Sequence, residues 1–225
     1  MAFNVAIDGP AGAGKSTIAK IVAKEKSFIY VDTGAMYRAM AIYFIKQGIQ
    51  ASESEKISAA VDGADVTIEY INGEQQVLLN GENVTPFLRT EEVGNMASVS
   101  SVNGDVRRKL VELQKKLAAT ANVVMDGRDI GTCVLPNAQV KVYLTASVDV
   151  RAKRRFDELV AKGQEADFEK IKKDIEERDY RDMNRDISPL RQAEDAVLVD
   201  SSYLNIQESA AEILKLIDEK LSDGK

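Results

Sequence analysis

The chain has 225 residues, 44% of them hydrophobic, which is enough for one large domain or for a core that carries a small inserted domain. Its 36 acidic and 30 basic residues leave a formal net charge of -6, which argues against a nucleic-acid partner. The sequence contains no histidine, so a histidine-based triad, metal site or proton shuttle is excluded.

Short apolar runs alternate with segments of helical periodicity along most of the chain. The runs that we interpret as strands are 3–8, 28–32, 122–126, 139–146 and 196–202. The clearest helical segments are 15–26, 35–47, 104–120 and 206–221. This alternation is typical of an α/β fold, and the valine and isoleucine content of the runs predicts a five-stranded parallel sheet flanked by helices.

Residues 64–88 interrupt the alternation with three short runs separated by Asn72-Gly73 and Asn80-Gly81. Both residues of an Asn-Gly pair tolerate positive φ, as a type I′ turn requires. The segment therefore predicts a three-stranded antiparallel sheet, and we interpret about 62–103 as an inserted domain. The predicted core consists of residues 1–61 and 104–225.

The composition also bears on location and assembly. Cys133 is the only cysteine, and no run of about 18 apolar residues is present to span a bilayer. The first residues carry no basic segment, and Asp8 interrupts the first apolar run, which argues against a signal peptide. We expect a cytoplasmic monomer that binds neither nucleic acid nor membranes.

A glycine-rich segment follows the first predicted strand and opens a helix. It reads Gly9-Pro10-Ala11-Gly12-Ala13-Gly14-Lys15-Ser16-Thr17 and matches the phosphate-loop motif G-x-x-x-x-G-K-[ST] in its strand-to-helix context. Backbone N–H groups of such a loop surround nucleotide phosphates, and the helix N-terminus attracts the same anion. We expect ATP as ligand, with Lys15 at the β- and γ-phosphates, Ser16 on Mg²⁺ and Thr17 near the α-phosphate.

The loop alone does not separate kinases from other nucleotide-binding proteins. A switch GTPase carries D-x-x-G after the loop and an N-K-x-D base-reading motif, and this sequence has neither. A motor ATPase is normally longer or carries recognisable partner modules. The sequence therefore favours a small-molecule kinase.

Three later motifs indicate a second ligand beside the loop. DTGAMYR (32–38) and DGRDIGT (126–132) each follow a predicted strand, where ligands bind in open α/β sheets. The third motif, RDxxDxNRxxSPL, spans residues 178–190. Because each motif contributes arginine, the set predicts a site for a second phosphate group.

In this order, the four motifs resemble those of bacterial cytidylate kinases, and the similarity covers essentially the whole chain. The resemblance implies a P-loop kinase fold in which the antiparallel sheet belongs to the acceptor-binding insertion. It also implies ATP-dependent phosphorylation of CMP and dCMP to CDP and dCDP. Thr33 stands where some members of the family have serine, and it keeps the hydroxyl group.

The resemblance also assigns roles to individual residues. It implies Thr33, Arg107 and Asp129 at the cytosine ring, Ser98, Arg178 and Asp182 at the ribose, and Arg38, Arg128 and Arg185 at the acceptor phosphate. The implied catalytic residues are Lys15, Arg38, Arg128 and Arg185. Cytosine presents an amino donor at N4 beside acceptors at N3 and O2, which a carboxylate and an arginine complement, whereas uracil reverses this polarity. Mispaired buried groups cost about 1 to 3 kcal/mol each, so discrimination against UMP is expected.

Residues 147–185 are dense in charges of both signs, and we expect them to face solvent and to be partly mobile. Arg151, Arg154 and Arg155 resemble the lid of nucleoside monophosphate kinases, which implies a helical lid at about 149–180 with Arg151 and Arg155 on ATP. The alternative is a solvated helix face paired with acids such as Glu158.

Several interpretations stay open. Arg107 could instead belong to the basic outer face of its helix, and Asp8 and Asp126 could either organise Mg²⁺-bound water or cap turns. Rival functions are a kinase for AMP, UMP, dTMP or shikimate, a non-catalytic nucleotide sensor, and a kinase of nucleic-acid 5′ ends. The acceptor motifs argue against the first, the intact Lys15 and Ser16 against the second, and the acidic balance against the third.

Overall fold

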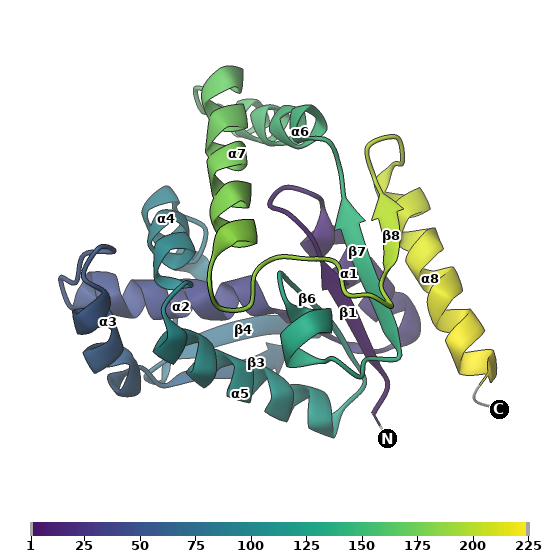
Figure 1. The fold of residues 1–225 in the computed structure, drawn as a ribbon, viewed down its shortest axis with the longest axis horizontal. Helices are drawn as coiled ribbons and strands as arrows, with labels where there is room; N and C mark the ends of the chain where they lie inside the picture. The colour runs from purple at the N-terminus through teal and green to yellow at the C-terminus, as the bar shows by residue number, and fades with distance from the viewer. Residues whose placement is uncertain (1, 224–225) are drawn as a thin grey trace.

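The computed structural model describes residues 2–223 and contains two separate sheets (Figure 1). The larger sheet has five parallel strands in the order β2-β6-β1-β7-β8. Its strands are β1 (Asn4–Asp8), β2 (Ile29–Asp32), β6 (Val123–Gly127), β7 (Val140–Thr145) and β8 (Val197–Asp200). Each predicted apolar run forms one strand, so the prediction of a five-stranded parallel sheet is confirmed.

Helices cover both faces of this sheet because its side chains alternate between two apolar clusters. Val124 packs in the cluster that includes α1 (Lys15–Lys26) and α8 (Ile206–Asp223). Its neighbours Val123 and Met125 pack in the opposite cluster. The helices that contribute to that second cluster are α2 (Thr33–Lys46), α3 (Ser54–Ala60), α4 (Glu91–Ser100) and α5 (Gly104–Thr120).

The predicted bounds of α1 and α5 agree with the structure, whereas α2 begins two residues earlier than predicted. Asp32 is the reason, because its Oδ1 accepts the backbone N–H of Ala35 at 2.9 Å and caps the helix. The cap places Thr33 in the first turn of α2, directly after the edge strand β2.

The smaller sheet is antiparallel, with the strands β3 (Val66–Ile71), β4 (Glu74–Leu79) and β5 (Glu82–Asn83). Both Asn-Gly pairs have positive φ at both residues, 53° and 79° at Asn72-Gly73 and 51° and 81° at Asn80-Gly81, which confirms the predicted turns. The third strand is shorter than predicted because the chain enters a 3₁₀ turn, η2 (Thr85–Phe87), at Pro86. A second such turn, η1 (Val61–Gly63), precedes β3.

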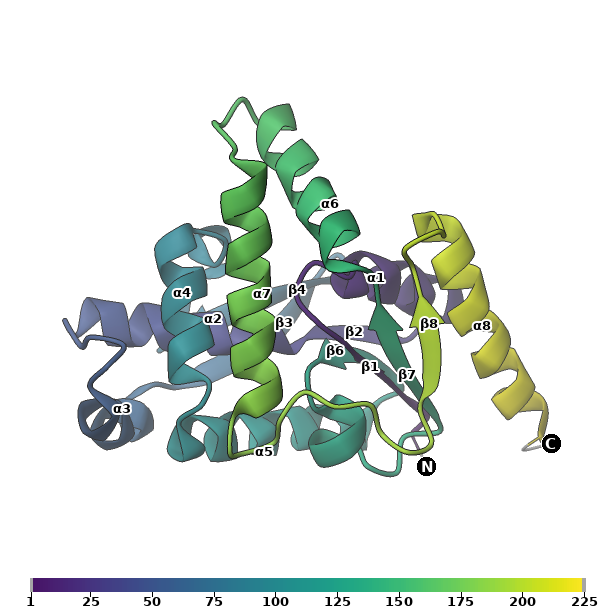
Figure 2. The ribbon, with the colours of Figure 1, turned by 45° about the horizontal axis from the view of Figure 1, so that its top comes forward.

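Helices α6 (Val148–Ala161) and α7 (Phe168–Asn184) form a hairpin beyond the carboxyl ends of the strands (Figure 2). The prediction that this region faces solvent is wrong for its inner side, where Arg151, Asp179, Asp182 and the following Arg185 are buried. These side chains are buried because they pair with one another or with the core across the hairpin's base. Within residues 2–223, no helix combines the length and apolar content needed to cross a membrane.

Candidate active site

The loop between β1 and α1 has the backbone of a phosphate cradle. Gly9, Gly12 and Gly14 have φ of 151°, 77° and 88°, which disfavour any residue with a Cβ. A Cβ at Gly9 would also lie 1.9 Å from the carbonyl oxygen of Leu144. The sequence motif therefore has the conformation that directs backbone N–H groups toward an anion at the N-terminus of α1.

Lys15 is buried at the start of α1, and its Nζ donates to the carbonyl oxygen of Pro10 at 2.8 Å. No carboxylate among the described residues forms an ion pair with it. Burial, reinforced by the Arg128 guanidinium, lowers the pKa of the Lys15 ammonium. Because burial disfavours the charged ammonium, an anionic ligand beside Lys15 would stabilise it.

Ser16 and Asp126 meet at the carboxyl end of the sheet. The Ser16 hydroxyl donates to Asp126 Oδ2 at 3.0 Å, and the Tyr30 hydroxyl donates to Asp126 Oδ1 at 2.8 Å. Burial, and then the nearby Asp32 carboxylate, raise the pKa of Asp126. Asp8 was expected either to organise Mg²⁺-bound water or to cap a turn. It caps a turn, because its carboxylate accepts the N–H groups of Ile130 and Gly131 at 2.8 and 2.7 Å.

The donor set fits Mg²⁺ carried by a nucleotide. Within the described part of the chain no cluster of three or more histidine, cysteine or carboxylate side chains could hold a metal ion by itself. Mg²⁺ in phosphoryl-transfer sites is commonly held by one or two protein oxygens together with substrate phosphates. The Ser16 hydroxyl supplies such an oxygen beside the loop and is hydrogen-bonded to the Asp126 carboxylate, whereas Thr17 is exposed.

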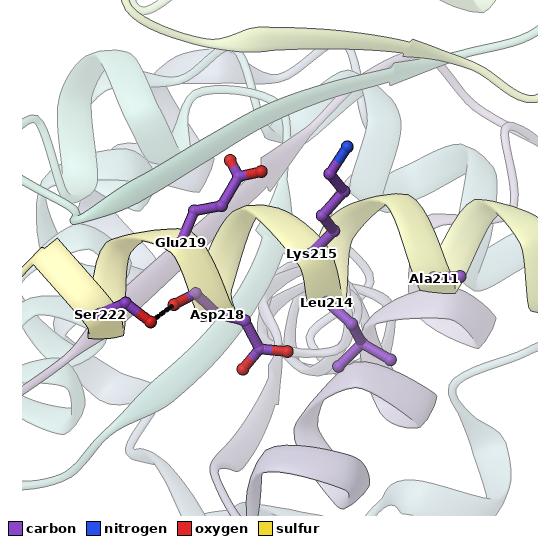
Figure 3. A pocket seen from close by; sticks show the side chains of 6 residues that line it. All are labelled: Ala211, Leu214, Lys215, Asp218, Glu219 and Ser222. Atoms are coloured by element: carbon purple, nitrogen blue, oxygen red, sulfur yellow. Dashed lines mark hydrogen bonds between the residues drawn. The ribbon is translucent and has the colours of Figure 1, made fainter.

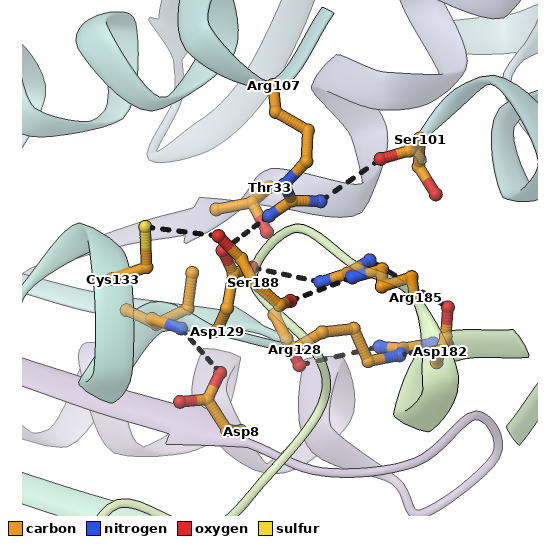
Figure 4. A network of polar contacts seen from close by, with 12 residues as sticks. Asp8, Thr33, Ser101, Arg107, Arg128, Asp129, Cys133, Asp182, Arg185 and Ser188 are labelled. Atoms are coloured by element: carbon orange, nitrogen blue, oxygen red, sulfur yellow. Dashed lines mark hydrogen bonds and ion pairs between the residues drawn. The ribbon is translucent and has the colours of Figure 1, made fainter. Parts of the chain in front are cut away.

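A second polar cluster lies next to the loop (Figure 4). Arg107 from α5 forms a buried ion pair with Asp129 and donates to the carbonyl oxygen of Ser101 at 3.2 Å. The Arg107 guanidinium also lies 5.6 Å from the centre of the Tyr37 ring. Only 3% of Arg107 is exposed, so the alternative that placed it on the outer face of α5 is wrong.

The remaining arginines of the cluster surround Asp129 and Asp182. Arg128 pairs with Asp182 at 2.8 Å, and Arg185 reaches Asp129 at 3.5 Å and Asp182 at 3.9 Å. Although burial acts to raise it, the Arg128 guanidinium holds the pKa of Asp182 below its usual range. Arg38 in α2 lies further out, 3.8 Å from the Asp32 carboxylate.

Several buried donors in this cluster lack a hydrogen-bond partner within residues 2–223. They are Arg107 Nε, Arg178 Nε, Arg185 Nη2, Ser98 Oγ and Tyr37 OH. The Thr33 hydroxyl donates to the carbonyl oxygen of Asp126 at 2.7 Å, which leaves its lone pairs to accept another donor. Because buried polar groups in native proteins are normally paired, this set indicates a polar, anionic ligand.

The three arginines of α6 differ in whether they contact the phosphate loop. Arg151 donates to the carbonyl oxygen of Ala11 at 2.9 Å and pairs with Asp179 at 2.6 Å, and Asp179 accepts the Ala11 N–H at 3.3 Å. Arg154 donates to the carbonyl oxygen of Ser201 at 2.6 Å. Arg155 is exposed and pairs with Glu158 at 2.9 Å, as the alternative of a solvated helix face describes.

Sequence reasoning gave no role to Tyr30 or Asp179. Tyr30 stands within a strand that reads as ordinary core, so only its position beside Asp126 distinguishes it. Asp179 belongs to the third motif, whose arginines, including its neighbour Arg178, were the basis of the predicted phosphate site. Its buried contacts with Ala11 and Arg151 come from three segments far apart in the chain.

Two shallow hollows lie outside these clusters. One is lined by a single helix, α8, with side chains such as Lys215 and Glu219, and includes no residue of the loop or the arginine cluster (Figure 3). The other is lined by Arg154, Leu204 and Asn205 with the two residues that follow. It lies near the loop, because the adjacent Ser201 hydroxyl is 3.3 Å from the carbonyl oxygen of Ala13.

Comparisons with known proteins agree with this geometry. The family model described as cytidylate kinase matches residues 5–219. The chain is 49% identical to the cytidylate kinase of Caldicellulosiruptor saccharolyticus, covering 95% of each chain, and 46% identical to that of Bacillus subtilis, covering 97% of each.

Solved structures support the fold. A gluconokinase from Sinorhizobium meliloti aligns with a TM-score of 0.51 at 14% identity, over 99% of this chain and 97% of that one. A shikimate kinase from Bacteroides thetaiotaomicron aligns with a TM-score of 0.50 at 14% identity, over 96% and 98%. Because the family model and these relatives match nearly the full length of the chain, the chain belongs to the cytidylate kinase family.

Proposed function

We propose that this enzyme transfers the γ-phosphoryl group of ATP to CMP and dCMP, forming ADP with CDP or dCDP. The observation that carries the proposal is the buried arginine cluster beside the phosphate loop, with donors that lack partners. A nucleotide-binding loop by itself accounts for one ligand. The second set of cations accounts for an acceptor that also carries a phosphate.

The donor side consists of the loop amides, Lys15 and Ser16. When bound with the donor nucleotide, Mg²⁺ neutralises charge on its phosphate oxygens. The loop holds the β-phosphate, and Lys15 exchanges its contact with Pro10 for phosphate oxygens. Ser16, whose hydroxyl is hydrogen-bonded to Asp126, would hold the metal. The hollow beside Arg154 and Leu204 is the proposed site of the donor base.

The acceptor side reads cytosine through its hydrogen-bond pattern. Asp129 accepts the N4 amino group, Arg107 donates to N3 and O2, and the free lone pairs of Thr33 accept a second amino hydrogen. Uracil places a carbonyl oxygen against Asp129 and an N–H against Arg107, so both are mispaired. Entry of the base requires the Arg107–Asp129 pair to share its hydrogen bonds with the ligand.

The other acceptor contacts follow the same division. Ser98 and Arg178 have unpartnered donors suited to the ribose, with Asp182 as a hydroxyl acceptor. The proposed phosphate clamp consists of Arg38, Arg128 and Arg185. Since the deoxyribose of dCMP keeps its 3′-hydroxyl, these contacts are compatible with both acceptors.

Catalysis rests on positioning and electrostatics. An oxygen of the acceptor phosphate attacks the γ-phosphorus, a new P–O bond forms, and the bond to the β–γ bridging oxygen breaks to release ADP. Lys15 and the arginine clamp stabilise the negative charge spread over the transferring group. The acceptor phosphate needs no base, so the absence of histidine is compatible with the reaction.

We also propose how the parts move. The insertion at about 62–103 binds the acceptor, and the hairpin at about 149–180 closes on the donor and excludes water. Arg151 already contacts the loop, and Arg155 would approach ATP only after such closure. The enzyme is proposed to act as a monomer.

The test is ADP release from ATP and Mg²⁺ with CMP, dCMP, UMP, AMP, GMP or dTMP as acceptor. We expect stimulation by CMP and dCMP, loss of activity in Lys15→Met, and full activity in the control Lys116→Met, which changes an exposed lysine of α5. Binding of ATP and CMP without ADP release would indicate a sensor instead. Preference for UMP or AMP, or for nucleic-acid 5′ ends, would refute the proposed acceptor.

A further inference from the structure

The Asp126 carboxylate is held from both sides by hydroxyl groups. Its Oδ2 accepts Ser16 Oγ at 3.0 Å, and its Oδ1 accepts the Tyr30 hydroxyl at 2.8 Å. Asp126 and Tyr30 are both buried, with 4% and 8% of their surfaces exposed. The three side chains therefore form one chain of hydrogen bonds from the interior of the sheet to the phosphate loop.

Strand register explains why Tyr30 reaches this carboxylate. In the parallel pair β2 and β6, Tyr30 is in register with Val124, and Asp32 with Asp126. Residues in register share a face of the sheet, so Tyr30 lies on the same face as Asp126 and two residues before it. The length of the phenol side chain spans that offset along the strand.

The surroundings keep the Tyr30 ring in place. It packs in the apolar cluster that includes Val124 and residues of α1, and Lys20 Nζ lies 5.6 Å from the ring centre. The backbone carbonyl of Tyr30 accepts the Tyr70 hydroxyl from β3 at 3.1 Å. Packing thus directs the Tyr30 hydroxyl toward the Asp126 carboxylate, to which it donates.

We infer that Tyr30 is a positioning residue for the metal of the donor nucleotide, acting through Asp126 on Ser16; this rests on the proposed use of Mg²⁺ and ATP. By donating to Oδ1, the phenol orients the carboxylate so that Oδ2 accepts the hydrogen bond of the Ser16 hydroxyl. The lone pairs of Ser16 are then directed away from the core, toward the phosphate loop. Without the phenol, the carboxylate can rotate and this orientation is lost.

Partners that orient metal ligands typically change metal affinity or activity about 10- to 100-fold when they are removed. For Tyr30→Phe, which deletes only the hydroxyl, we expect the half-saturating Mg²⁺ concentration for ADP formation to rise about tenfold. The second readout is calorimetric binding of a non-hydrolysable ATP analogue with Mg²⁺ and with EDTA. Binding in EDTA should equal that of the unmodified enzyme, while the gain on adding Mg²⁺ falls about tenfold.

The matched control is Tyr70→Phe, which removes a hydroxyl bonded to the backbone of Tyr30 but not to Asp126. Its Mg²⁺ dependence should be unchanged. In a Ser16→Ala background, Tyr30→Phe should have no additional effect, because the path through Ser16 is already broken.

Three outcomes would overturn the inference: a change of less than about twofold in Mg²⁺ dependence, against the expected tenfold, an equal loss of analogue binding in EDTA, or additive effects in the double variant. Thermal unfolding of each variant shows whether it is folded. If the unmodified enzyme released no ADP with CMP, the proposed acceptor would be wrong, yet the analogue titration would still test Tyr30 independently.

Discussion

Asp129→Asn is the substitution that best separates recognition of the base from stability of the fold. The side chain keeps its size, but the buried Arg107 guanidinium loses its anionic partner and Arg185 loses a nearby charge. Removal of one partner of a buried pair typically costs 3 to 5 kcal/mol, and we expect about 3 because asparagine still offers one acceptor oxygen. For a chain of this size that corresponds to a melting temperature about 6 to 12 °C lower.

The effect on recognition has a different origin. In the Asp129→Asn variant, the introduced amide can turn its NH₂ group toward O4 of uracil, which the native carboxylate cannot do. A hydrogen bond to a charged group contributes about 1.5 to 3 kcal/mol, so the preference for CMP over UMP should fall about 10- to 150-fold.

The assay is the ratio of kcat/KM for CMP to that for UMP, measured below the melting temperature of the variant. Asp186→Asn is the control, because this acid is exposed and lies close in sequence to Arg185. If Asp129→Asn lowered kcat/KM equally for both acceptors, the ratio would be unchanged. Asp129 would then only support the cluster, and the proposed reading of cytosine would be refuted.

Three further predictions concern stability and binding. Burial raises the pKa of Asp8 to about 6. Between about pH 4 and 6 the folded state therefore binds more protons than the unfolded chain, and the free energy of unfolding falls as pH rises. Asp8→Asn should remove about 3 kcal/mol of this pH dependence, which is followed by comparing melting temperatures at pH 4 and pH 7. Burial and the neighbouring Arg128 lower the pKa of Arg178 to about 10, which shows that the buried guanidinium is costly to the fold. Arg178→Met should therefore raise the free energy of unfolding by about 1 kcal/mol while raising KM for CMP at least tenfold. A lower KM would contradict the proposed contact of Arg178 with the ribose. Asn103 caps α5 through the N–H groups of Asp105 and Val106 at 3.0 and 3.3 Å, so Asn103→Ala should cost about 1 to 2 kcal/mol in urea denaturation, and an unchanged midpoint would show that the cap is dispensable.

Features governed by neighbouring residues could be read from the sequence. The glycines of the loop and the Asn-Gly pairs demand a positive φ, and the structure has it at each position discussed above. The apolar runs specify strands because a strand buried on both faces needs continuous apolar side chains. The resemblance to cytidylate kinases added the expected acceptor residues, which no local rule supplies.

Other features could not be read in this way. Arg151 and Arg155 lie one helical turn apart with similar neighbours, yet one contacts the loop and the other pairs with Glu158 at the surface. Nothing in the local sequence separates them, because the difference is the distance of each turn from Ala11 in space. The same holds for Arg107, whose basic neighbours suggested an outer face and whose side chain is buried.

By itself the sequence determined the α/β class, the phosphate loop and the turns of the small sheet, since each depends on side chains and dihedral angles within a few residues. Only the tertiary structure decided which charges are buried together. The strand order β2-β6-β1-β7-β8 places β2 beside β6, and this adjacency brings Tyr30 to Asp126 across 96 positions of the chain. Such contacts arise from packing between distant segments, and no periodicity or spacing along the chain encodes them.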